Sequence, residues 1–162
     1  MGEHAKDPRF AALYGLMVVE ARITERLDAA LDAEAGISLS RLELLLHLHW
    51  KDGRRRMSDL ADALLLSRGG ATRLVSKAEE EGLVRREIPP DDRRATYAVL
   101  TDAGREAAER GFPIYTELQT KLFQEHVTDE EAEMLVRIWS RVLDANGSPC
   151  EPISAAAAEL AT

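Results

Sequence analysis

The amino-acid sequence predicts a mainly α-helical fold with one small β-hairpin. Three observations lead to this class. Apolar residues recur at helical spacing along most of the chain. Two short helical patterns in the middle are separated only by Leu65 and Leu66, which is the tight joint of a helix-turn-helix. Two runs of β character then flank a proline-containing turn at residues 89–92.

Length and composition indicate one globular domain, with or without appended helices. The chain has 162 residues and a formal net charge of −8, and a chain of this size buries roughly 68–70% of its unfolded surface without a staple. A single Cys excludes a disulfide framework and a Cys-rich metal cluster. No apolar run approaches the roughly 18 residues of a membrane span, and residues 1–9 lack an apolar signal core. We therefore expect a cytoplasmic protein that does not bind membranes.

The charge is unevenly distributed along the chain. Residues 51–100 hold 11 basic and 9 acidic residues, a net charge of +2, whereas the other 112 residues hold 10 basic and 20 acidic ones, a net charge of −10. Phosphate binding depends on the local field at the contact face rather than on the total charge. The middle segment can therefore face nucleic acid, although a solvated charged surface would give the same count.

The N-terminal arm reads as a long helix over residues 8–33. Its apolar residues form two overlapping stripes, so this helix should contact two partners. Gly36 ends the pattern. Ser40 followed three residues later by Glu43 is a capping-box signature, which predicts a second helix from Ser40 to about Trp50.

The middle segment carries the helix-turn-helix and the hairpin. Ser58 is expected to cap a helix over 59–64, and Ser67 a second helix over 67–81, which Gly82 ends. Residues 83–88 and 95–100 are the predicted strands.

The C-terminal arm reads as two helices. The first covers residues 102–126, where Gly111 and Pro113 should bend or loosen it. A capping box opens the second, at 128–143. Residues 148–162 show little periodicity and are expected to form a loosely ordered tail.

The N-terminal end of the second helix of the helix-turn-helix has the composition of a DNA-reading surface. Such helices lie in the major groove and contact base edges with their first residues, and the apolar residues here point to the opposite side. The alternative is an ordinary amphipathic helix with a frayed start. The residues that would face DNA are Ser67, Arg68, Gly69, Gly70, Thr72, Arg73 and Lys77.

The hairpin tip gives a second signal for DNA binding. It carries Arg93 and Arg94, and arginines suit the negative potential of a narrow minor groove. Asp92 stands two residues before Arg94 and could brace its guanidinium group. A solvated charged turn is the alternative. Arg86, on the first strand of the hairpin, completes the candidate DNA contacts.

Five segments of the middle region form one ordered set of motifs: MSDLA at 57–61, LSRGGATRLV at 66–75, EGLVRR at 81–86, DDRR at 91–94 and LTDAGR at 100–105. Through these segments, residues 57–105 resemble the MarR-type (multiple antibiotic resistance regulator) family of winged helix-turn-helix transcriptional regulators. The element order extends the resemblance to about residues 10–145. One departure is Leu65, where the family often has Gly; if its backbone is left-handed, Leu costs on the order of 1 kcal/mol there.

The resemblance implies a homodimer that binds double-stranded DNA at a palindromic operator, most often as a repressor. The family's wing arginine corresponds to Arg94 and its bracing aspartate to Asp92, and the recognition-helix contacts fall on the residues named above. The implied divisions are an N-terminal dimerisation helix at 1–36, the winged helix-turn-helix at 37–105, C-terminal dimerisation helices at 106–145 and the tail at 146–162.

The resemblance also implies a small effector, often an aromatic acid, that releases DNA. His47 and Trp50 share one helix face and would place a polar group beside an apolar wall. Core packing is the alternative reading for all of the candidates. They are Tyr14, Met17, His47, Trp50, Phe112 and Tyr115.

No pattern indicates a metal, a cofactor or catalysis. His47 and His49 are two residues apart on a helix and cannot chelate one ion together. Cys150 has no neighbour that would stabilise a thiolate, so we expect it to be incidental. The chain lacks a Gly-rich phosphate loop and a catalytic triad pattern. The remaining alternative to a DNA-binding regulator is a winged-helix module for protein–protein assembly.

Overall fold

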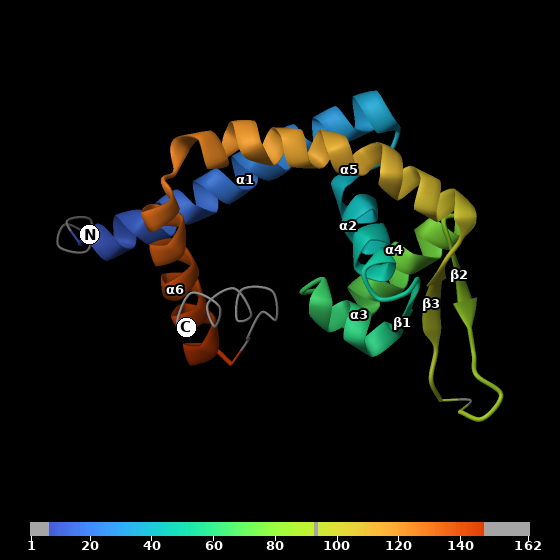
Figure 1. The fold of residues 1–162 in the computed structure, drawn as a ribbon. Coiled ribbons are helices and arrows are strands. Elements are labelled where there is room, and N and C mark those ends of the chain that lie inside the picture. The colour runs from blue at the N-terminus through green and yellow to red at the C-terminus, as the bar shows by residue number, and fades with distance from the viewer. Residues whose placement is uncertain (1–6, 93, 148–162) are drawn as a thin grey trace.

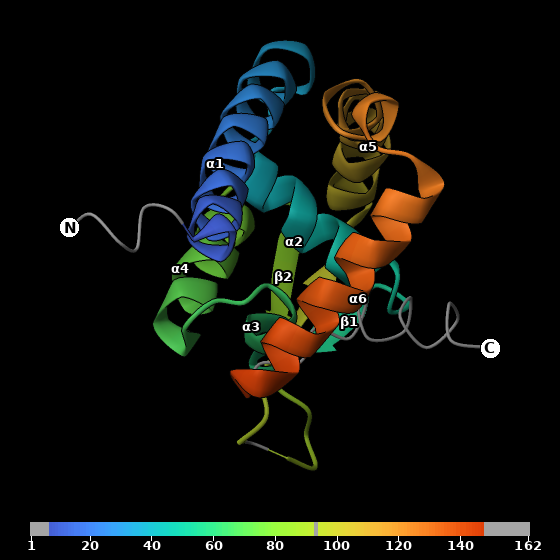
Figure 2. The ribbon, with the colours of Figure 1, turned by 90° about the vertical axis from the view of Figure 1, so that its left-hand side faces the viewer.

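The computed structural model describes residues 7–92 and 94–147. Helices α1 and α5 lie side by side as a long upper arm, with the winged-helix half below one end and α6 below the other (Figure 1). Figure 2 shows the same arrangement from the side of α6. The elements, in chain order, are α1 (Pro8–Ala35), α2 (Leu39–His49), β1 (Arg54–Arg56), α3 (Met57–Ala63), α4 (Arg68–Glu80), β2 (Val84–Glu87), β3 (Tyr97–Leu100), α5 (Asp102–Leu122), the 3-10 helix η2 (Gln124–His126) and α6 (Asp129–Ala145). The predicted class, mainly helical with a small β wing, is confirmed.

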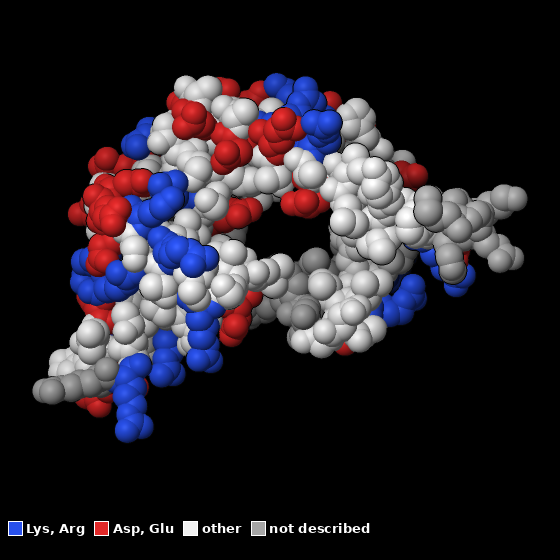
Figure 3. Space-filling model, turned by 180° about the vertical axis from the view of Figure 1, so that it is seen from behind, with Lys and Arg blue, Asp and Glu red and all other residues white. Residues whose placement is uncertain are grey.

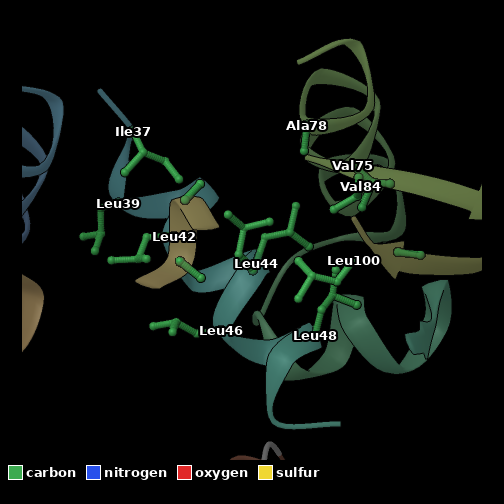
Figure 4. Packing of buried hydrophobic residues seen from close by; sticks show 14 of the residues in the cluster. Ile37, Leu39, Leu42, Leu44, Leu46, Leu48, Val75, Ala78, Val84 and Leu100 are labelled. Carbon is green, nitrogen blue, oxygen red and sulfur yellow. The ribbon is translucent and has the colours of Figure 1, made fainter. Parts of the chain in front are cut away.

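Helix α2 is the centre of the hydrophobic core. All six leucines of this helix are buried, whereas Glu43 and His47 are only partly buried and Ser40 and His49 are exposed. Leu42, Leu44, Leu45 and Leu48 have no exposed surface. Figure 4 shows Leu42, Leu44 and Leu48 between α5 on one side and Val75, Val84 and Leu100 of the winged helix on the other. Truncating such a leucine to alanine costs about 2–5 kcal/mol, so α2 joins the upper arm and the winged helix into one rigid unit.

Two of the predicted helix starts are wrong. Helix α2 begins at Leu39 rather than at a Ser40 capping box, because Asp28 of α1 accepts a hydrogen bond from the Leu39 backbone N–H at 2.7 Å. Helix α3 begins at Met57, and the Ser58 hydroxyl donates to the Asp59 carboxylate instead of capping the helix. The α2 start depends on a residue of another helix, which a local pattern does not contain.

The wing sheet has three strands where the sequence indicated two. Strand β1 pairs antiparallel with β3, which also pairs with β2, in the order β1-β3-β2. Three consecutive arginines do not look like a strand, but the Arg54 guanidinium lies 3.6 Å from the centre of the Tyr97 ring. A cation–π contact of this kind, together with the ladder, stabilises the third strand.

The bend or loosening expected at Gly111 and Pro113 does not interrupt α5, which continues through both residues from Asp102 to Leu122. A Cβ at position 111 would lie 2.9 Å from a methyl carbon of Leu42, so this glycine lets α5 pack closely on α2. The Thr116 hydroxyl donates to the carbonyls of Phe112 and Pro113, at 3.1 and 3.0 Å. The helix ends at Leu122, and the residues expected to continue it to 126 form the 3-10 helix η2.

The two arms leave a large apolar surface exposed. Helix α1 is buried only at Leu27 and Leu31, while its N-terminal half exposes Leu13, Tyr14 and Met17 by about 60% each. Helix α6 opens with the predicted Thr128 capping box but buries none of its residues completely. Among the described residues, no helix combines the length and the apolar character that a membrane crossing requires. The predicted tail at 148–162, with Cys150, lies outside the described residues.

Candidate nucleic-acid interface

Helix α4 presents a polar face outward from a firmly capped start. Ser67 is its N-cap, and the Ser67 hydroxyl accepts a hydrogen bond from the Gly70 backbone N–H at 3.1 Å. Ala71, Val75 and Ala78 are buried on the opposite face. The side chains predicted to face DNA therefore share one surface. Those exposed on it are Ser67, Arg68, Thr72, Arg73 and Lys77.

The joint before α4 is held in a strained backbone conformation. Leu65 has a φ of +53°, in the left-handed region that costs a side-chain-bearing residue roughly 1–2 kcal/mol. The N–H groups of Leu65 and Leu66 bond to the carbonyls of Asp62 and Ala61 and close the turn. The joint therefore holds the direction in which α4 leaves α3.

Between α4 and the wing lies a groove of about 490 Å³. Three arginines line it, from three elements: Arg56 of β1, Arg68 of α4 and Arg94 of the wing loop. Thr72 and Thr96 supply hydroxyl groups, and no carboxylate is among the lining side chains. Lys and Arg side chains project from the lower edge of the winged-helix half in Figure 3, with most Asp and Glu of that face above them. The groove can therefore hold an anionic backbone.

Arg56 is the residue of this groove that the sequence did not indicate. It belongs to the run Arg54–Arg56. The pairing of β1 with β3 determines to which side of the sheet each of these arginines points. Arg54 is engaged by Glu87 at 3.2 Å and Arg55 lies 3.5 Å from the His47 ring, whereas Arg56 lines the groove. The arginine run itself was the available signal.

The sequence suggested that Asp92 braces the Arg94 guanidinium, but in the structure Asp92 bonds to the Arg94 backbone instead. Its carboxylate accepts a hydrogen bond from the Arg94 backbone N–H at 3.0 Å, and it lies 3.9 Å from the Arg56 guanidinium. Asp92 therefore shapes the loop and leaves the Arg94 side chain exposed at the groove. Arg93 lies outside the described residues.

Arg86 is turned toward the protein rather than toward the groove. Its guanidinium donates to Glu79 at 2.7 Å, to Ser76 at 2.8 Å and to the Thr72 carbonyl at 3.1 Å. Its backbone N–H donates to the same carboxylate at 3.0 Å. We therefore expect Arg86 to tie the wing to α4 rather than to contact DNA directly.

Two glycines, Gly69 and Gly70, occupy the first turn of α4. A Cβ on Gly69 would have no atom closer than the Arg73 guanidinium, at 3.9 Å, so the glycine is not required by packing. A Cβ on Gly70 would lie 3.3 Å from the capping hydroxyl of Ser67. Gly69 therefore keeps the outer surface of the helix start flat.

The six candidate effector residues do not form one site. His47, Trp50 and Tyr115 line a pocket of about 210 Å³ between α2, the end of α3 and α5. Phe112 lines a smaller hollow, of about 120 Å³, on the other side of Trp50, together with His49. Tyr14 and Met17 line neither of these two hollows and are exposed on α1. The two histidines thus face different hollows, as their spacing predicted.

Comparison with known proteins identifies the family. The MarR family model matches residues 35–95. Over 130 residues the chain is 32% identical to the uncharacterised HTH-type transcriptional regulator YdgJ of Bacillus subtilis, covering 80% of this chain and 76% of YdgJ. It is 32% identical over 92 residues to a second uncharacterised regulator of that organism, YkoM, covering 57% of this chain but only 60% of YkoM.

A solved structure matches both the arms and the winged helix. Sco3205, a MarR family transcriptional regulator from Streptomyces coelicolor crystallised in complex with DNA, superposes with a TM-score of 0.79 at 27% identity, covering 87% of this chain and 92% of Sco3205. These relatives are transcriptional regulators, which confirms the expectation of a non-enzymatic protein. Its motifs, its fold and these relatives together show that the chain belongs to the MarR family of winged helix-turn-helix transcriptional regulators.

Proposed function

We propose that this DNA-binding regulator recognises a specific duplex sequence by placing α4 in the major groove and the Arg94 loop in the adjacent minor groove. The observation that carries this proposal is the groove in which Arg56, Arg68 and Arg94 converge without a carboxylate among the lining side chains. Exposed Arg73 and Lys77 extend the basic surface along α4. Arginines at the helix start suit base edges, and the remaining cations suit phosphates.

The regulator acts as a homodimer on a palindromic operator. Support comes from the apolar surface of the arms, which one chain leaves uncovered. Leu16, Val19 and Ile23 of α1 face Phe123 and Trp139 across an apolar groove of about 310 Å³. Obligate dimers bury such surfaces, typically more than about 2,000 Å² in total. Two copies joined there would carry two α4 helices, one for each half of a palindrome.

A repressor role with release by a small aromatic effector fits the remaining features. The pocket beside Trp50 is lined by Leu65, two residues before the Ser67 cap of α4, so a ligand there can bias the direction of α4. Because its relatives are bacterial regulators, we infer that the protein works in the cytoplasm.

The test begins with genomic fragments that the purified protein retains at physiological salt. Sequencing them should give one palindromic motif, and the protein should bind it at least about 1,000-fold more tightly than random duplex. Retention of fragments without a shared motif would contradict the proposed specificity. Absence of any salt-dependent binding to duplex would favour the alternative of a protein-assembly module.

A further inference from the structure

The pocket beside Trp50 has one acidic wall and aromatic walls. Glu43 and His47 of α2 stand on one side, with Trp50 at the end of that helix and Tyr115 of α5 opposite. The rings of His47 and Trp50 meet edge to face, with their centres 6.0 Å apart. The pocket, of about 210 Å³, suits a small ligand, because drug-sized ligands occupy roughly 300–1,000 Å³.

Glu43 has no hydrogen-bond or ion-pair partner among the described residues, although it is half-buried. Burial raises the pKa of its carboxyl group. Burial also raises the pKa of Tyr115, with a further contribution from Glu43, so the phenol is neutral. An unpaired carboxylate in a partly desolvated site is a costly group that a bound cation would satisfy.

His47 does not supply a compensating positive charge. Burial lowers its pKa first, and the nearby Arg55 lowers it further, so the ring is neutral at pH 7. The Arg55 guanidinium lies 3.5 Å from the Nδ1 of His47 and is not among the side chains that line the pocket. A carboxylate ligand would therefore meet Glu43 and no cation in the lining.

We propose that this pocket binds a small organic cation, with an amine or quaternary ammonium head group held by the Glu43 carboxylate and the faces of Trp50 and Tyr115. Aromatic faces attract cations through their quadrupole, and a neighbouring carboxylate adds a direct charge pair. The ligand class thus differs from the aromatic acid that the sequence suggested.

The same pocket is placed to affect α4. Ala63, Leu64 and Leu65 form its remaining wall, and Leu65 is the left-handed residue of the joint before Ser67. A ligand whose head group is held at Glu43 also contacts this apolar wall and favours one position of the joint over another, which is the differential contact that coupling requires. This regulatory consequence, unlike the binding itself, rests on the proposed function.

The test is isothermal titration calorimetry of the full-length chain with benzyltrimethylammonium and with benzoate, two probes that share an aromatic ring and differ in charge. At neutral pH the ammonium should bind more tightly than benzoate. Glu43→Gln should lower the ammonium affinity by about 10- to 100-fold, the range expected when a contact to a charged group is lost. The control Glu109→Gln changes an exposed carboxylate beside the other face of Trp50 and should leave the affinity unchanged.

Tighter binding of benzoate, no heat with millimolar ammonium, or an unchanged affinity in Glu43→Gln would overturn the proposal. Operator affinity is measured in parallel at fixed ionic strength, with and without the ammonium. If wild-type protein binds the ammonium through Glu43 but no DNA, the proposed function fails and the ligand assignment stands. If DNA binds equally well with and without bound ammonium, the coupling through Leu65 is wrong while the pocket's ligand class is supported.

Discussion

The Arg86 guanidinium lies 2.7 Å from the Glu79 carboxylate and ties strand β2 of the wing to the C-terminal half of α4. Both side chains are partly buried, and the same carboxylate also accepts the Arg86 backbone N–H. Glu79 thereby holds the wing, whose loop carries Arg94, in a fixed position relative to α4, which carries Arg68 and Arg73. We expect this ion pair to act on DNA binding by positioning the wing rather than by contacting DNA.

Arg86→Lys should therefore weaken operator binding although it conserves the charge. A lysine ammonium cannot reach Glu79, Ser76 and the Thr72 carbonyl together, so the wing loosens and the protein loses about 1 kcal/mol of stability. Affinity measured across a salt series should fall by a constant factor with an unchanged slope. A variant with wild-type affinity would indicate instead that Arg86 serves as a simple positive charge at a phosphate.

Gly69→Ala should separate helix stability from DNA binding. Alanine fits at this position and favours the helix by up to about 1 kcal/mol. The added methyl group projects from the exposed start of α4, where the backbone approaches DNA in the proposed complex. We expect a higher urea midpoint and a weaker operator affinity in the same variant. Equal or tighter DNA binding would show that the flat start is not needed for the approach.

Glu43→Gln should change the pH dependence of stability. Burial raises the pKa of the Glu43 carboxyl group above its usual 4.5, so the folded chain binds this proton more tightly than the unfolded chain. The ionised Glu43 carboxylate therefore lowers the free energy of unfolding at pH values above its pKa. This penalty disappears at low pH, where the group is protonated in both the folded and the unfolded chain. The free energy of unfolding of the variant should therefore increase relative to that of the wild type as pH rises from below 4.5 toward neutrality. Urea unfolding at a series of pH values measures this, and parallel profiles would contradict it.

Val19→Glu should shift the protein from dimer to monomer. It places a charge in the apolar groove that Phe123 and Trp139 help to line, where a partner chain is proposed to pack. Light scattering should give about twice the 18.0 kDa chain mass for the wild type and the chain mass for the variant. The change Glu80→Ala, at an exposed position on α4 away from the arms, is the control and should remain dimeric. A monomeric wild type would contradict the dimer.

The sequence predicted those parts of the molecule that depend on neighbouring residues. The Ser67 cap, the Gly82 stop and the face on which Arg73 stands all follow from local spacing, and the structure confirms the helix and its caps. Contacts between distant segments could not be predicted in this way. The start of α2 is held by Asp28 of α1 instead of by the expected Ser40 cap. The Arg86 side chain points toward α4 because it bonds to Glu79.

The candidate site shows the same division. Arg94 was indicated by its place at the hairpin tip, whereas Arg56 joined the site only through the β1–β3 pairing. Glu43 was assigned to a capping box from its spacing, but the true helix start lies one residue earlier and its carboxyl group lines a pocket. Two residues can thus have the spacing of a capping box without capping the helix, because their side chains make other contacts.

The most direct test of the central claim is the operator affinity of Arg94→Ala and Arg73→Ala, each titrated over a range of salt concentrations beside the wild type. With about six phosphate contacts per dimer, the wild-type slope of log affinity against log salt should be near −5. Arg73→Ala should cost about 1–3 kcal/mol on the operator and much less on random duplex. Arg94→Ala should weaken binding most where A-tracts narrow the flanking minor groove. If both variants bound the operator as tightly as the wild type at physiological salt, α4 and the wing would not be the surfaces that read DNA.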